Sequence, residues 1–84
     1  MYALTFDPKA ISFLDKLPLS IKHRIFTKIE EAQTSPFHYF ERLTQINSFK
    51  LRIGEYRVIA DISQKEKTIS VQLIGHRKNV YQKL

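Results

Sequence analysis

The sequence predicts an α+β fold in which two N-terminal helices pack on one face of a mainly antiparallel sheet. Apolar residues recur at helical spacing between residues 8 and 32, and they alternate with polar residues between 49 and 74. A Gly-Glu pair lies between two alternating segments, as in a hairpin turn. The predicted order is strand–helix–helix–strand–strand–strand (βααβββ), and 84 residues suit one domain, 1–84.

The first helix follows a short strand over residues 2–6. Asp7 supplies an oxygen for the N-cap and Pro8 suits the first helical position. Pro18 is expected to end the helix. One side of this helix is apolar and is expected to be buried; it consists of Ala10, Ile11 and Leu14.

The second helix carries a single apolar stripe that we assign to the core. Its members follow one another at i, i+4, i+8 and i+11 and are Ile21, Ile25, Ile29 and Ala32. Ser20 is expected at the N-cap or in the first turn, and Pro36 is expected to end the helix. The aromatic segment 37–40 then reads as a connection that folds back onto the core.

A period of two begins at Phe49 and defines three strands. With Gly54-Glu55 as a two-residue loop, the strand that ends at Ile53 pairs with a strand over 56–62. A further strand is expected over 68–74. Its inward side chains are expected to be Ile69, Val71 and Leu73.

This hairpin register predicts that three basic side chains share the face opposite the helices. Arg52 pairs with Arg57, and Lys50 lies on the same face. Two arginines directly opposite each other repel, but their guanidinium groups match the oxygens of a phosphate. We therefore predict an anion-binding site; the alternative is that Asp61 or the C-terminal tail relieves the repulsion.

The polar tail adds further candidates for this site. Arg77 and Lys78 follow Gly75, which is expected to end the last strand and to direct them to the rim of the basic face. Tyr81 suits base stacking or proton exchange, or it packs on the core. His76 is a candidate titrating and phosphate-binding group beside Arg77.

Composition limits the classes of function. Net charge is +6, and the whole excess lies in residues 42–84. This asymmetry suggests nucleic acid or an acidic protein as partner, and a solvated surface is an equal alternative on charge alone. Cysteine is absent and no cluster of histidines or carboxylates suggests a metal, so we expect neither metal nor cofactor. The N-terminus resembles no export signal and no apolar run could span a bilayer, so we expect a cytoplasmic protein without membrane contact.

Several segments together resemble the RelE/ParE toxin superfamily. The resemblance covers nearly the whole chain in the right order. It rests on 6–10 (Phe-Asp-Pro-Lys-Ala), 16–18 (Lys-Leu-Pro), 49–58 (Phe-Lys-Leu-Arg-Ile-Gly-Glu-Tyr-Arg-Val) and 74–81 (Ile-Gly-His-Arg-Lys-Asn-Val-Tyr).

The RelE branch implies a metal-independent ribonuclease that cuts mRNA in the ribosomal decoding site by attack of the 2′-hydroxyl on the phosphate. The resemblance places Lys50 and Arg52 around the scissile phosphate and Arg57 on the phosphorane. It gives Arg77 a protonating role, but arginine keeps its proton, so we prefer Arg77 as a charge stabiliser with the proton arriving through water or Lys50. Tyr81 matches a tyrosine that stacks on the nucleotide or acts as base.

The resemblance also implies partners and leaves alternatives open. The expected partners are the ribosome with its mRNA and a RelB-like antitoxin whose acidic segment wraps the toxin as a hetero-oligomer. Ser48 stands where active members often carry another lysine, which bears on catalytic strength. The alternatives are a ParE-like inhibitor of DNA gyrase and a catalytically weak antitoxin-binding module.

Overall fold

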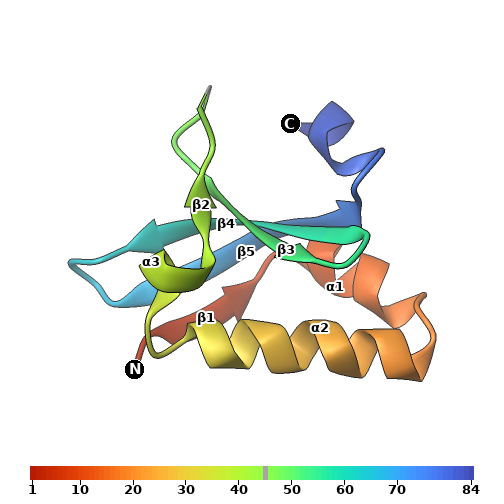
Figure 1. The fold of residues 1–84 in the computed structure, drawn as a ribbon, viewed down its shortest axis with the longest axis horizontal. Helices are drawn as coiled ribbons and strands as arrows, with labels where there is room; N and C mark the ends of the chain where they lie inside the picture. The colour runs from red at the N-terminus through yellow and green to blue at the C-terminus, as the bar shows by residue number, and fades with distance from the viewer. Residues whose placement is uncertain (45) are drawn as a thin grey trace.

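The computed structural model describes residues 1–44 and 46–84. Helices and strands follow in this order (Figure 1): β1 (Ala3–Phe6), α1 (Pro8–Asp15), α2 (Leu19–Ala32), α3 (Pro36–Tyr39), β2 (Glu41–Arg42), β3 (Phe49–Ile53), β4 (Tyr56–Ser63), β5 (Thr68–His76) and a 3₁₀ helix, η1 (Val80–Lys83). In these described ranges no helix has the length and apolar character needed to cross a membrane.

The sheet has the strand order β1-β5-β4-β3-β2, with β1 parallel to β5 and every other pair antiparallel. Helices α1 and α2 lie along one side of it (Figure 1). The predicted α+β class is therefore confirmed, and the six predicted elements occur in the predicted order. The short elements α3, β2 and η1 were not predicted.

The main core lies between α1, α2 and the sheet. Asp7 caps α1 by accepting a hydrogen bond from the Lys9 backbone N–H at 2.9 Å, as expected, and Pro8 is the first helical residue. Ala10 and Leu14 are buried, but Ile11 is 39% exposed. The predicted burial of Ile11 is wrong, because only one narrow side of this two-turn helix meets the sheet.

Helix α2 buries the predicted stripe. Ile25, Ile29 and Ala32 are fully buried, and Ile21 packs against the same core. The helix ends at Ala32, before Pro36, which instead opens the one-turn helix α3. The segment 37–40 is thus partly helical rather than only a connection, since Pro at a first helical position favours a new turn.

A β-bulge changes the predicted inward side of β5. Ile59 pairs with Leu73 and the next residue, Ala60, pairs with Val71, so β5 holds one extra residue between the two pairs. Beyond the bulge the alternation reverses, and Ile74 rather than Leu73 joins the core. The expectation for Leu73 is wrong because a strict period of two assumes a regular ladder.

The face opposite the helices carries a small apolar contact of its own. Val80 is 1% exposed and packs on Gly75, where an added Cβ would lie 3.1 Å from the Val80 Cβ. Gly75 is inside β5 and does not end the strand as predicted. The missing side chain lets the segment after β5 fold onto the sheet, so residues 76–81 are not simply a polar tail.

We predict that Gly75→Ala destabilises the fold by about 1–3 kcal/mol, as expected for overpacking. The backbone of Gly75 has no positive φ, so the crowding against Val80 is the cause. Denaturant unfolding measures the change. In the double variant with Val80→Ala, part of the loss should disappear; strictly additive losses would contradict the steric explanation.

Candidate functional site

The turn at Gly54 sets the register of the basic face. Gly54 has φ +57°, a conformation that glycine adopts without strain, and the β3–β4 pairs are those predicted from a Gly-Glu loop. Arg52 pairs with Arg57, and Lys50 with Ile59. The three basic side chains therefore stand on the sheet face that the helices leave free.

Arg57 is the one of these three that is buried. Only 8% of it is exposed, and its Nη1 donates hydrogen bonds of 2.8 Å to the carbonyl oxygens of Gly54 and Tyr56. These two contacts occupy both Nη1 hydrogens. The Nε and Nη2 hydrogens remain as a flat edge of the kind that binds two oxygens of a phosphate.

Asp61 does not relieve the repulsion between the paired arginines. One of its oxygens accepts a hydrogen bond from the Ser48 hydroxyl at 2.8 Å, and the other accepts from Gln72 Nε2 at 3.4 Å. The alternative in which Asp61 relieves this repulsion is therefore wrong. The buried guanidinium is held by carbonyl dipoles of its own hairpin, which leaves its positive charge without a carboxylate partner among the described residues.

Pairing of β4 with β5 brings the second arginine to the site. The ladder runs to the Tyr56–His76 pair, and the next residue, Arg77, donates its backbone N–H to the Glu55 carbonyl at 2.7 Å. The Glu55 carboxylate lies 3.9 Å from both Arg77 and His76, but it is largely exposed. Such pairs contribute little, so the backbone contact positions Arg77.

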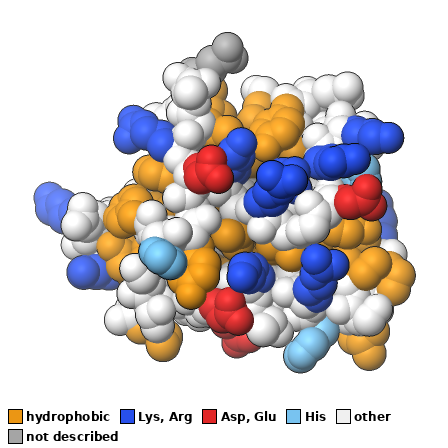
Figure 2. All heavy atoms as spheres, viewed as in Figure 1, with side chains coloured by type: hydrophobic (Ala, Val, Ile, Leu, Met, Phe, Trp, Pro, Cys, Tyr) orange, Lys and Arg blue, Asp and Glu red, His pale blue; other side chains and the backbone are white. Residues whose placement is uncertain are grey.

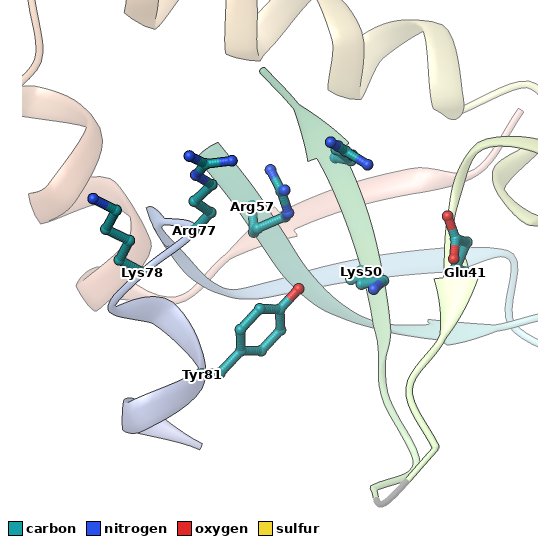
Figure 3. A pocket seen from close by; sticks show the side chains of 7 residues that line it. Glu41, Lys50, Arg57, Arg77, Lys78 and Tyr81 are labelled. Carbon is teal, nitrogen blue, oxygen red and sulfur yellow. The ribbon is translucent and has the colours of Figure 1, made fainter. Parts of the chain in front are cut away.

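The contact of Val80 with Gly75 positions Tyr81. Because Gly75 pairs with Arg57, Val80 docks beside the buried arginine. Tyr81 follows on η1 and is 40% exposed, with its hydroxyl directed toward the space between Arg57 and Lys50 (Figure 3). The alternative in which Tyr81 packs on the core does not occur.

These side chains line one pocket of about 520 Å³. It contains six of the seven residues predicted for the site, together with one that was not predicted. The lining residues are Glu41, Lys50, Arg52, Arg57, Arg77, Lys78 and Tyr81 (Figure 3). His76 lies outside this lining; its ring contacts Tyr56 edge to face, and its Nδ1 accepts the Lys78 backbone N–H at 3.3 Å.

Glu41 was missed because β2 was missed. The two-residue strand pairs with β3 so that Glu41 lies opposite Lys50, which brings a carboxylate to the edge of the basic face. The available signal was the alternation of buried Phe40 with exposed Glu41, which is too short to identify a strand.

The pocket is suited to bind an anion and to transfer protons to or from it. Five cations line it against one carboxylate, and basic side chains are numerous on the face shown in Figure 2. A fixed buried guanidinium supplies charge stabilisation without reorganisation. The carboxylate and the phenol supply groups that can accept or donate a proton.

The family model and the solved structures that match this chain both belong to toxin–antitoxin systems. The family model described as the ParE toxin of the type II toxin–antitoxin system parDE matches residues 4–81. A chain in the RelBE2 toxin–antitoxin complex of Mycobacterium tuberculosis superposes with a TM-score of 0.83 at 24% identity, covering 90% of this chain and 98% of that one. A chain in the RelB–RelE complex of Methanococcus jannaschii gives 0.73 at 25% identity, covering 95% and 98%. The sequence matches no curated protein.

We predict opposite effects on stability from the two paired arginines. Arg57→Gln should lower the free energy of unfolding by about 1–3 kcal/mol, because the carbonyls of Gly54 and Tyr56 lose their hydrogen bonds from a charged donor. Arg52→Gln should leave it unchanged or raise it by up to about 1 kcal/mol, because Arg52 is exposed and opposes a like charge. Denaturant unfolding at low salt compares them; equal losses would argue against a carbonyl-held Arg57.

Proposed function

The chain belongs to the ParE toxin family of type II toxin–antitoxin systems, within the RelE/ParE superfamily, and from this premise we propose that it is a metal-independent endoribonuclease that cuts mRNA on the ribosome. The observation that carries the proposal is the pocket that joins Lys50, Arg57, Arg77, Tyr81 and Glu41. A protein that acts only by binding needs complementary charge. A pocket that also contains a carboxylate and a phenol is equipped for proton transfer.

The charges of the pocket fit attack by a ribose 2′-hydroxyl on the adjacent phosphate. The new bond joins O2′ to phosphorus, the bond to the 5′-oxygen of the next nucleotide breaks, and the products are a 2′,3′-cyclic phosphate and a free 5′-hydroxyl. Arg57 binds two equatorial oxygens through its free edge, while Arg77 and Arg52 stabilise the added negative charge of the phosphorane. Lys78 binds a flanking phosphate at the rim.

The reaction needs two proton transfers, one from the 2′-hydroxyl and one to the departing 5′-oxygen. Glu41 is the carboxylate of the pocket lining and is our choice for the base that removes the proton from the 2′-hydroxyl. The departing 5′-oxygen takes a proton from Lys50 directly or through water. Tyr81 then stacks on a neighbouring base and orients the sugar, as an exposed aromatic side chain at a basic site does.

The proposed partner that holds this activity in check is an antitoxin of the RelB type. Several similar solved chains come from RelB–RelE complexes. An acidic segment laid over the pocket would neutralise the cations and exclude RNA at the same time.

We predict that the purified chain cuts mRNA only in the presence of translating ribosomes. Primer extension should show new 5′ ends within codons, and the upstream fragment should carry a cyclic phosphate. Arg77→Ala should lower the cleavage rate by roughly 10²–10³, the cost of one transition-state donor, and should remain folded.

Efficient cutting of naked RNA at the same positions would refute the ribosome requirement. No RNA cleavage, combined with trapped gyrase–DNA complexes, would select the ParE-like alternative. Tight binding of an antitoxin, with neither RNA cleavage nor gyrase inhibition, would support the alternative of a catalytically weak antitoxin-binding module.

A separate prediction concerns the base. Glu41→Gln should lower the single-turnover rate by about 10²–10⁴, the usual contribution of a general base, while RNA affinity stays the same or rises. Tyr81→Phe should retain most of the rate if the tyrosine only stacks. The reverse result, with Tyr81→Phe inactive and Glu41→Gln active, would assign the base to Tyr81.

A further inference from the structure

A second basic groove adjoins the active-site pocket. It has a volume of about 620 Å³ and lies between α2 and the end of β3. Arg52 lines both hollows, so the two adjoin at that side chain. In Figure 2 basic side chains extend from the region of the β3–β4 hairpin toward α2.

One of the side chains that line the groove is Arg24, whose guanidinium lies close to the Gly54 turn. Arg24 projects from α2 against Gly54, where a Cβ would lie 2.8 Å from the Arg24 Nη2. The turn therefore carries guanidinium groups from two elements, because the Gly54 carbonyl also accepts a hydrogen bond from Arg57. Glycine at this turn permits the close approach of Arg24 as well as the positive φ.

The charge of the groove is available to an outside anion. Arg24 is exposed and forms no ion pair within the described part of the chain. Lys28, by contrast, lies 3.5 Å from Glu31 and over the ring of Tyr39, so it is partly engaged. Arg24 and Arg52 are consequently the cations that a ligand would meet.

We propose that this groove binds the phosphodiester backbone of an RNA strand that extends beyond the scissile phosphate. The strand passes from the pocket over Arg52 and the Gly54 turn onto α2, where Arg24 contacts a further phosphate. This assignment rests on the proposed ribonuclease function and adds a second subsite to it. RNA suits the geometry because its phosphates repeat along the chain, and successive cations on a continuous surface match that repeat.

The test compares binding of two noncleavable 2′-O-methyl oligonucleotides by fluorescence anisotropy at several salt concentrations. One is a trinucleotide, which fills the pocket only, and the other has about 12 nucleotides, the scale of a single-strand site. For the longer one, Arg24→Gln should weaken binding several-fold at low salt and reduce the slope of log K against log salt by about 0.7, the loss of one phosphate contact. Trinucleotide binding should not change.

Lys65→Gln is the matched control, because it removes one positive charge from the β4–β5 turn, outside both hollows. If Lys65→Gln weakened binding of the longer RNA as much as Arg24→Gln does, the effect would come from net charge alone, and the inference would be overturned. Unchanged binding of the longer RNA by Arg24→Gln would also overturn it, whereas the proposed function would stand as long as the trinucleotide binds. If Arg24→Gln weakened only the binding of an acidic peptide, the groove would be a protein surface. If the parent bound neither RNA, the inference would fall, whereas the proposed function would still be decided by the cleavage assay on translated mRNA.

Discussion

The register of the β3–β4 hairpin is the constraint on which the rest of the molecule depends. Side chains of a strand alternate between faces, so a slip of one residue in β3 would turn Arg52 into the core and expose Leu51. The same slip in β4 would turn Arg57 inward and expose Val58. The two-residue turn at Gly54 excludes that slip. One local feature therefore decides both which side chains hold the helices and which side chains face a ligand.

The site places positive charges close together, and the fold compensates for their repulsion with backbone carbonyl groups. Arg57 lies opposite Arg52, yet its buried guanidinium is held by two carbonyl groups of the turn rather than by a carboxylate. Carbonyl dipoles fix the orientation of the group and leave its full charge available. A carboxylate partner would have fixed it equally well and weakened its attraction for an anion.

Much of this arrangement was predictable from the sequence because it follows from local rules. The Asp7–Pro8 start of α1, the stripe of α2 and the pairing of Arg52 with Arg57 depend on residues close together in the chain. The same rules predicted that Arg77 would lie near the basic face. The superfamily that the comparisons identified was indicated by the resemblance of several segments along the chain, not by these rules.

The features that escaped prediction depend on tertiary contacts. The bulge in β5 arises between two strands and has no signature in either one, so Leu73 was placed on the wrong face. Strand β2 has two residues and exists only because it pairs with β3, which is why Glu41 was overlooked. The packing of Val80 on Gly75 could not be predicted, because a glycine in the sequence does not show which side chain will pack closely against it.

The parallel pairing of β1 with β5 has a consequence for the order of assembly. Ala3 pairs with Thr68, so β1 has no partner until β5 has been synthesised. Arg77 and Tyr81 come later still, and the hollow that they line is incomplete without them. A chain that is still being synthesised therefore passes through an interval in which this pocket is not yet formed. Contacts between distant parts of a chain form slowly, which extends this interval.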